Sequence, residues 1–315
     1  MFAHVVSTLF PVFSVLLLGF ILVRTGFMSS SFVEEMNNLI YWVALPAFIV
    51  GTLGRSSGMP ASVLPLVAVF AISTVAFVII CWAVLRISGF PTAARGTFLQ
   101  AVYRGNLAFI GIPILIYALR GLPQSEIDPV TRQAVFLFAP TMVLYNLIAA
   151  VVFPLPMAAA GSFPRWRSTL KGLWRNPLLI ASLTGVGLIL LPWKLPEAAL
   201  DSLDYLGTFA APAAVLGVGG AMAGTPLGDH WRAALASALL KVAGLPLVTL
   251  LVAMPFGLGR RELLILLIFS TAPCAAGGYV IARKMGGDGR LAAGAIFIST
   301  VLSVITLSVV IAWFG

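Results

Sequence analysis

The chain has 315 residues, of which 60% are hydrophobic and only 9% are charged, and its mean hydropathy is +1.07. A soluble domain of this size needs more polar surface, so the composition excludes an ordinary soluble protein. The net charge of +9 comes mostly from loop arginines and lysines of the kind that orient membrane proteins. It is therefore no evidence for nucleic-acid binding.

Ten apolar segments follow one another along the chain, each long enough to cross a bilayer core of about 30 Å. They cover residues 5–23, 36–54, 62–85, 95–119, 133–157, 174–193, 203–224, 233–255, 262–282 and 291–314. The first segment has no Lys or Arg before it and is too long for a signal-peptide core, so we expect it to stay in the membrane. The sequence thus predicts an all-α polytopic membrane protein with ten transmembrane helices.

Nine glycines and prolines of the first half recur 166 positions later, as from Pro11 to Pro177. The matched pairs are Pro11/Pro177, Gly19/Gly185, Pro46/Pro212, Gly51/Gly217, Gly54/Gly220, Gly58/Gly224, Pro60/Pro226, Gly111/Gly277 and Gly121/Gly287. Chance would give about two such matches, so a duplication is indicated. Because each copy has an odd number of spans, the second enters the bilayer from the opposite side. We expect two inverted five-helix repeats, residues 1–160 and 176–315, joined by a cytoplasmic linker, residues 161–175.

The basic residues of the predicted loops favour one side of the membrane. Eleven lie on one side: Arg24, Arg86, Arg95, Arg165, Arg167, Lys171, Arg175, Arg232, Arg283, Lys284 and Arg290. Six lie on the other: Arg55, Arg120, Arg132, Lys194, Arg260 and Arg261. The richer side is expected to be cytoplasmic, which places both termini outside.

The remaining polar residues offer no catalytic or metal-binding pattern. Two Cys and two His, scattered along the chain, give no ligand spacing, so we expect no metal and no cofactor. An intramembrane enzyme needs a nucleophile with a base, or a pair of acids, at membrane depth. The ten Asp and Glu residues lie instead in predicted loops or at span ends. We therefore expect no enzyme.

The fourth and ninth segments contain sequences that interrupt a helix. The fourth reads RGNLAFIGIP from Arg104 to Pro113, and the ninth reads STAPCAAGGY from Ser270 to Tyr279. Proline removes a backbone donor, and glycine permits unwound backbone, which membranes tolerate where it is buried or lines a wet cavity. Either segment alone is also explained by a packing kink. Two at corresponding places favour a crossover site in which half-helix N-termini bind an anion.

Two basic residues, Arg104 and Lys241, fall inside predicted spans without an acid at the same depth. A bound anion is the natural counter-charge, while snorkelling or a carbonyl-satisfied structural role is the alternative. Asn106 can orient a carboxylate or cap a half-helix. The candidate substrate-binding residues are Asn106, Arg104, Gly111, Pro113, Pro273, Cys274, Gly277, Tyr279 and Lys241.

Several short motifs occur in order along the chain. They are Pro11 with LGF at 18–20, ALPA at 44–47, RGNxxxIGIP at 104–113, Asn176-Pro177, Lys241 with Pro246, ARKxGGD at 282–288 and Ser299-Thr300. Together they resemble the auxin efflux carrier family over essentially the whole chain. The span-four motif with its ordered neighbours is fairly specific.

The resemblance implies a ten-span carrier of organic anions, similar in plan to sodium/proton antiporters, whose transport domain moves against a scaffold by an elevator motion. It implies that Asn106 and Pro113 belong to a first crossover and Pro273 to a second. Bacterial members include proteins called malonate transporters, and plant members export an indole carboxylate. Members often carry Asn or Ser shortly after the second crossover proline, whereas here residues 274–278 read CAAGG. Backbone amides or Tyr279 are the alternative contacts from that side.

We therefore expect a secondary transporter of a small organic anion, such as malonate or an auxin-like acid, in a bacterial inner membrane. A homodimer is implied by the resemblance alone. The alternatives are a sodium-coupled symporter of the bile-acid type, which would gather acids and amides at the crossover, and an anion channel or sensor. The sequence leaves the substrate, the direction of transport and the coupling ion open.

Overall fold

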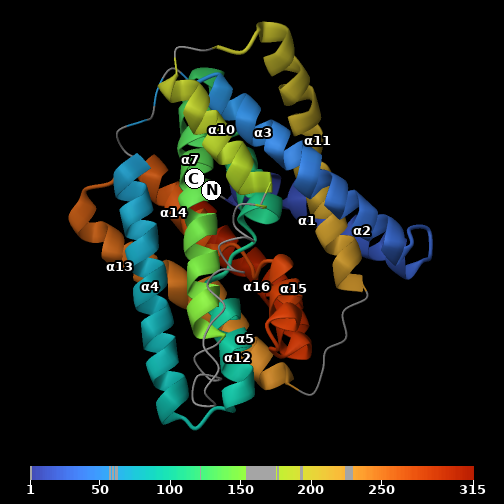
Figure 1. Cartoon of the computed structure of the whole chain (residues 1–315), viewed down its shortest axis with the longest axis vertical. Helices are drawn as coiled ribbons and strands as arrows, with labels where there is room; N and C mark the ends of the chain where they lie inside the picture. The colour runs from blue at the N-terminus through green and yellow to red at the C-terminus, as the bar shows by residue number, and fades with distance from the viewer. Residues whose placement is uncertain are drawn as a thin grey trace.

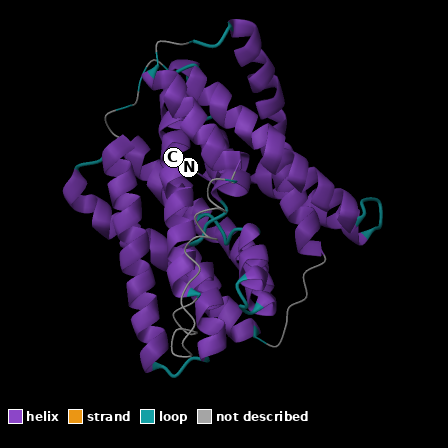
Figure 2. Cartoon of the chain, in the orientation of Figure 1, coloured by secondary structure: helices purple, strands orange, loops and turns teal. Residues whose placement is uncertain are grey.

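The computed structural model describes residues 2–56, 58, 60, 63–120, 122–153, 175, 177–191, 194–223 and 230–315. Figures 1 and 2 show that the regular elements of these residues are helical. Within these described residues, seven helices are long and apolar enough to cross a membrane: Val6–Arg24, Ser30–Gly54, Val63–Ile87, Gln124–Ala149, Glu197–Ala223, Trp231–Phe256 and Gly289–Phe314. They coincide with seven of the ten predicted segments, which confirms an all-α polytopic membrane protein. The predicted linker lies outside the described residues except for Arg175.

The three other predicted segments have shorter or interrupted helices. Segment 95–119 consists of α5 (Thr92–Tyr103), the π turn η2 (Leu107–Gly111) and α6 (Ile112–Ala118). Segment 262–282 consists of α14 (Arg260–Thr271) and α15 (Gly277–Lys284). Segment 174–193 contains α10 (Pro177–Leu190). The fourth and ninth segments are thus broken, as their glycines and prolines predict.

The long helices are α1 (Phe2–Arg24), α4 (Val63–Ile87), α7 (Gln124–Val152), α11 (Glu197–Ala223) and α16 (Gly289–Phe314). Two more are composite: α2 (Ser30–Leu39), η1 (Ile40–Ala44) and α3 (Leu45–Gly54) form one, and α12 (Trp231–Leu239), η3 (Leu240–Gly244), α13 (Leu245–Ala253) and η4 (Met254–Phe256) form the other. Helix α7 begins nine residues before the predicted start at residue 133. Its first turns carry Glu126, Asp128 and Arg132, and hydropathy gives no signal for a helix that continues into water.

Each of the three π turns in the described part of the chain is followed closely by a proline. Pro46, Pro113 and Pro246 each follow the last residue of a π turn by two positions. A proline has no N–H group, and its ring clashes with the carbonyl four residues earlier. The wider turn accommodates this, because the N–H of the preceding residue bonds five residues back, as from Leu245 to the Leu240 carbonyl. These prolines therefore widen their helices without ending them.

The helices form two packing groups (Figure 1). In the first bundle, α1 packs on α11, and α3 packs on α10 and α11. In the second bundle, α4 packs on α7 and α13, α5 on α16, and α14 on α13 and α16. The bundles meet where α1 contacts α6 and α16, where α7 contacts α3 and α10, and where α11 contacts η2.

Glycines bring the helices of the first bundle into backbone contact. A Cβ atom on Gly19 would lie 2.1 Å from the carbonyl oxygen of Leu216, and one on Gly219 would lie 1.8 Å from that of Leu16. Helices α1 and α11 thus exchange the same contact in both directions. Gly185 gives a different close contact, because its Cβ would lie 2.6 Å from the Leu53 side chain on α3.

Arg55 connects the ends of α3 and α11. Its guanidinium donates to Asp204 at 2.7 Å, Asp201 at 2.7 Å and Glu197 at 2.9 Å. These hydrogen bonds raise the pKa of the Arg55 guanidinium above its usual value, so it stays charged. All three acids, in the first turns of α11, are thereby paired with a cation at the surface.

Aromatic residues fill the core of the second bundle. The Tyr145 ring lies 5.5 Å from that of Tyr103 and 6.3 Å from that of Phe70, which in turn lies 6.5 Å from that of Phe269. The hydroxyl group of Tyr103 donates to the Tyr145 carbonyl at 3.0 Å. This cluster fixes α4, α5, α7 and α14 around the two helix breaks.

Candidate functional site

The two helix breaks pair with each other through their backbones. Gly105 and Cys274 form an antiparallel bridge. The backbone N–H of Asn106 donates to the Pro273 carbonyl at 2.7 Å, and the backbone N–H of Ala275 donates to the Arg104 carbonyl at 2.9 Å. Unwound backbone inside a membrane needs such partners, because unsatisfied amides there are costly. The breaks therefore form one crossing rather than two independent kinks.

New helical segments begin directly after the crossing. Leu107 starts η2 on one side, and Gly277 starts α15 on the other. Helix N-termini carry partial positive charge, and their first N–H groups lack partners within the helix. Helix α16 supports the second strand of the crossing, because the Ser299 hydroxyl accepts a hydrogen bond from the Cys274 amide at 2.9 Å. The crossing thus presents two positive backbone ends from a rigid support.

A cavity of about 560 Å³ adjoins the crossing, within the size range of small-molecule sites. It is lined by Asn37, Asn38, Tyr41, Trp42, Arg104, Gly105, Asn106, Leu107, Ala108, Phe109, Phe138, Met142, Leu178, Val218, Ala221, Ala275, Ala276, Gly277 and Ile281. Helices α2, α10 and α11 supply the wall from the first bundle, and the crossing with α7 supplies the wall from the second. The cavity therefore lies between the two bundles.

Arg104 is the one formally charged side chain among the described residues that line this cavity. Its two terminal nitrogens donate to Oδ1 of Asn146 at 3.3 and 3.2 Å, and its Cζ lies 5.7 Å from the centre of the Tyr145 ring. Both partners are neutral. The cavity consequently carries a net positive charge, which favours an anionic ligand.

Two amides that line the cavity have unused hydrogen-bonding atoms. Asn106 is 4% exposed, and its Nδ2 atom has no partner among the described residues. The Oδ1 atom of Asn37, on the opposite wall, is likewise buried without a described partner. A buried polar atom left unpaired costs about 1–3 kcal/mol. Asn106 is therefore suited to donate to a ligand oxygen.

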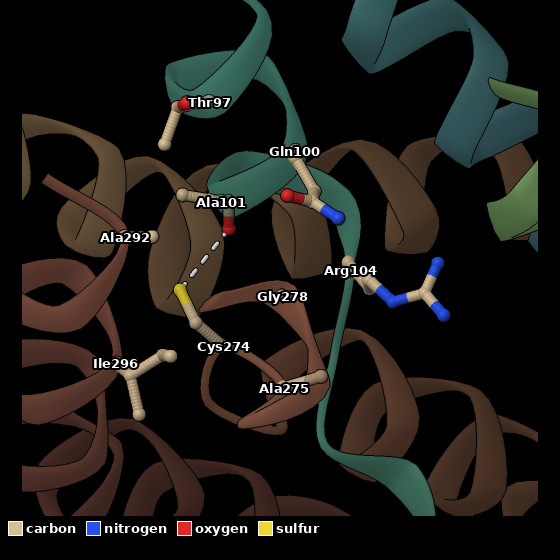
Figure 3. Close-up of a pocket in the computed structure, with 9 residues that line it drawn as sticks. All are labelled: Thr97, Gln100, Ala101, Arg104, Cys274, Ala275, Gly278, Ala292 and Ile296. Carbon is tan, nitrogen blue, oxygen red and sulfur yellow. Dashed lines mark hydrogen bonds between the residues drawn. The ribbon is translucent and has the colours of Figure 1, made fainter. Parts of the chain in front are cut away.

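A second, much smaller pocket lies behind the crossing (Figure 3). Its volume of about 10 Å³ holds at most one water molecule. Figure 3 shows the Cys274 thiol, which donates to the Ala101 carbonyl at 3.1 Å, and the Arg104 side chain pointing away from it. The Nε2 atom of Gln100 in this pocket has no partner among the described residues. The small pocket suits a single water, and the larger cavity is the candidate ligand site.

The structure separates the candidate residues predicted from the sequence into groups. Arg104, Asn106 and Gly277 line the large cavity, and Cys274 lines the small pocket. Pro273 belongs to the crossing through its carbonyl group. Gly111, Pro113 and Tyr279 are absent from both linings: the first two are buried in η2 and α6, whereas Tyr279 is 42% exposed on α15.

Lys241 lies beneath the crossing and does not line the cavity. It is 0% exposed, and its ammonium group donates to the Ser270 carbonyl. A Cβ atom on Gly105 would lie 3.3 Å from its Nζ atom. This geometry corresponds to the carbonyl-satisfied structural alternative rather than to contact with a ligand.

Sequence reasoning missed the residues that hold and face Arg104. Asn146 and Tyr145 on α7 surround its guanidinium, and Asn37, Asn38 and Tyr41 form the opposite wall. Amides within apolar segments are themselves unusual in membrane proteins. Asn37, Asn38 and Asn146 therefore carried a signal that the hydropathy pattern alone did not use.

Comparison with known proteins agrees with this picture. A family model described as a membrane transport protein matches residues 4–156 and 165–311. A protein of Rhizobium meliloti (strain 1021) named "Putative malonate transporter" is 24% identical over an aligned length of 321 residues, gaps included. The alignment covers 97% of this chain and 94% of that protein. The family match confirms the resemblance stated from the motifs.

Proposed function

Because the chain belongs to the membrane transport protein family, we propose that it is a secondary transporter that carries a small organic anion across a bacterial inner membrane. The family itself makes the protein a multi-pass membrane transporter rather than an enzyme. The proposal adds the class of substrate, the site and the manner of transport.

One observation carries the proposal: the cavity between the bundles places Arg104, which has no acidic partner among the described residues, beside Asn106, whose buried Nδ2 atom has no described partner either. Arg104 supplies the charge, and Asn106 Nδ2 supplies an oriented donor. A carboxylate accepts both kinds of bond, and charge-assisted hydrogen bonds are about twice as strong as neutral ones. The helix N-termini at Leu107 and Gly277 add favourable potential for an anion.

The proposed substrate is a small carboxylate such as malonate or an auxin-like acid. Malonate is suggested by the printed name of the Rhizobium relative. An aromatic acid is suggested by the cavity itself, since its volume is about 560 Å³ and its walls include Tyr41, Trp42, Phe109 and Phe138. Direct comparison of the two acids separates these possibilities.

We infer an elevator mechanism in which the second bundle carries the crossing past the first. The division into two bundles with the cavity at their boundary supports this. So does the exchange of contacts between repeats: Gly19 packs α1 on α11, and its match Gly185 packs α10 on α3. These contacts support two inverted repeats, residues 1–160 and 176–315, with ten spans in all.

The cavity is proposed to face the cytoplasm. Its first-bundle residues Asn37, Leu178 and Ala221 lie in the first third of the composite helix Ser30–Gly54, near the start of α10 and near the end of α11. These helix ends lie on the side to which the sequence assigns eleven of the 17 basic residues of the predicted loops, the side expected inside. The structure then corresponds to an inward-facing state.

A sodium-coupled symporter fits the crossing less well. Such a site needs several acidic or amide oxygens around a cation. The described crossing offers Asn106 with the Arg104 guanidinium nearby, which repels a cation. An anion carrier is the better explanation of this charge distribution.

The test is flux of labelled malonate and labelled indole-3-acetate in proteoliposomes under an imposed membrane potential. We expect potential-driven flux of one acid, with kcat/KM lowered about 10- to 100-fold in both Asn106→Ala and Arg104→Gln, because the first removes a hydrogen-bond donor to the carboxylate and the second removes the positive charge that pairs with it. Gln124→Ala, an exposed amide bonded to Asp128 at 2.6 Å, is the matched control. Absence of carboxylate flux under potential, proton and sodium gradients would overturn the proposal, and unchanged flux in both site variants would move the site elsewhere.

A further inference from the structure

We propose that Asn146 sets the anion selectivity of the cavity: it orients Arg104 with a neutral oxygen and so leaves its positive charge for the substrate. Asn146 does not line the cavity, so it is a positioning residue that acts through Arg104. This inference rests on the proposed function, because it assigns the determinant of substrate charge at that same site.

The orientation of the Asn146 amide is fixed by the backbone of its own helix. Its Nδ2 atom donates to the Met142 carbonyl at 2.8 Å. An amide offers donors on one side and an acceptor on the other. With Nδ2 committed to α7, the Oδ1 atom faces Arg104 and accepts from both of its terminal nitrogens. One acceptor therefore holds the guanidinium plane in place.

The same arrangement leaves binding capacity on Arg104. A guanidinium has five N–H donors. The Asn146 Oδ1 atom accepts from two of its nitrogens at 3.2 and 3.3 Å, which is longer than the 2.7–2.9 Å typical of a carboxylate partner. The Tyr145 ring covers one face, and the Tyr103 hydroxyl holds the Tyr145 backbone. Arg104 is thus positioned by weak, neutral contacts.

A carboxylate in place of the amide would change the charge of the site at nearly the same volume, and it would also lose the hydrogen bond that Nδ2 donates to the Met142 carbonyl. Asp and Asn have nearly the same volume, but an Asp at this position would form an ion pair with Arg104 and cancel the charge of the cavity. A substrate anion would then have to displace that carboxylate. Leucine at the same position would remove the acceptor while leaving the cavity positive. The two substitutions therefore separate charge from positioning.

The experiment measures equilibrium binding of two acid and amide pairs, malonate with malonamide and indole-3-acetate with indole-3-acetamide, to the purified full-length protein. The variants are Asn146→Asp, Asn146→Leu and the control Thr141→Val. The Thr141 hydroxyl donates within α7, to the Leu137 carbonyl at 2.8 Å. We expect the wild type to prefer one acid over its amide by about 100-fold, the scale for a substrate charge that meets a buried cation.

The proposal expects Asn146→Asp to weaken binding of the acid about 100-fold, because the introduced carboxylate neutralises Arg104, while the amide binds as before. Asn146→Leu should keep the preference for the acid, with affinity lowered less than about 10-fold, since only orientation is lost. Thr141→Val should match the wild type. Equal loss in Asn146→Asp and Asn146→Leu, or no loss in Asn146→Asp, would overturn the proposal.

Gel filtration and thermal unfolding verify that each variant is folded. Should Asn146→Asp not fold, Asn146→Leu is compared with Arg104→Gln. Only Arg104→Gln should lose the preference for acid over amide. Equal loss of this preference in Asn146→Leu and Arg104→Gln overturns the inference. Failure of the wild type to bind either acid overturns the proposed function together with this inference. Acid binding by the wild type that Asn146→Asp leaves intact overturns the inference alone.

Discussion

The backbone N–H of Asn106 donates to the Pro273 carbonyl at 2.7 Å, and this bond joins two helix breaks that come from opposite halves of the chain. Each break supplies the backbone partner that the other lacks. A substrate that touches Asn106 therefore meets a surface whose shape depends on both halves. The site is a property of the pair, and a change in either break should alter both.

The first prediction concerns Gly105, which lies at the centre of the crossing. A Cβ atom there would lie 3.1 Å from Leu107 Cδ2 and 3.3 Å from both the Phe269 carbonyl oxygen and Lys241 Nζ. Gly105→Ala should lower the free energy of unfolding by about 1–3 kcal/mol, and Gly105→Val by more, because two of these neighbours are held in place. Thermal unfolding in detergent measures this.

The control for Gly105 is Gly187→Ala on α10, where an added Cβ would meet no atom within 4 Å. Alanine favours a helix over glycine by up to about 1 kcal/mol, so this variant should be as stable as the wild type or more stable. A Gly105→Val protein with wild-type unfolding temperature would contradict the tight crossing.

The second prediction concerns the reciprocal contact between α1 and α11. Gly19→Ala and Gly219→Ala each place a methyl group against a backbone carbonyl, so each should cost at least about 2 kcal/mol of unfolding free energy. The double variant should cost less than the sum, because one separation of the helices relieves both clashes. Strict additivity in a double-mutant cycle would argue against a shared contact.

The third prediction separates Lys241 from the substrate. Lys241→Met keeps the length of the side chain but removes the ammonium group that donates to the Ser270 carbonyl. The Michaelis constant for the transported acid should stay within about two-fold of wild type, because the ammonium group lies outside the cavity; the cost should fall on stability, about 1–3 kcal/mol for the unpaired carbonyl. Labelled-acid flux and thermal unfolding report the two effects. A tenfold rise in the Michaelis constant with an unchanged maximal rate would place Lys241 in contact with the substrate.

The fourth prediction concerns Arg55, whose removal leaves Glu197, Asp201 and Asp204 close together on α11. Arg55→Ala should lower the unfolding temperature at low salt through repulsion among these carboxylates. The decrease should shrink in about 0.5 M NaCl, because exposed charges are screened. Lys194→Ala removes an exposed charge near the same helix and should change little. A salt-independent effect of Arg55→Ala would indicate a packing role instead.

The local signals in the sequence were reliable for the spans and the breaks. Apolar length identified the long helices, and the proline and glycine content of segments 95–119 and 262–282 identified the interruptions, because both effects act within a few residues. Arg104 and Asn106 stood out because polar groups at membrane depth are costly. The roles of Asn146 and Tyr41 could not be predicted in this way, since they depend on how α7 and α2 pack against the crossing.

The extent of α7 shows a second limit. The helix begins at Gln124 in a polar stretch, where its stability comes from backbone hydrogen bonds and from contacts such as the ion pair of Glu126 with Arg261. A hydropathy pattern detects where a helix meets lipid. It does not detect where the helix ends in water.

The number of residues in each π turn determines the direction of the side chains that precede it in the same helix. Each contains one residue more than an α-helical turn would, and one residue corresponds to about 100° of rotation. A helical wheel continued backward from Pro46 therefore misplaces Tyr41, and one continued from Pro246 misplaces Lys241. A single-residue deletion in such a turn would rotate every earlier side chain of that helix by a quarter turn or more. In this fold, an insertion or deletion can redirect a binding-site side chain that no substitution could move.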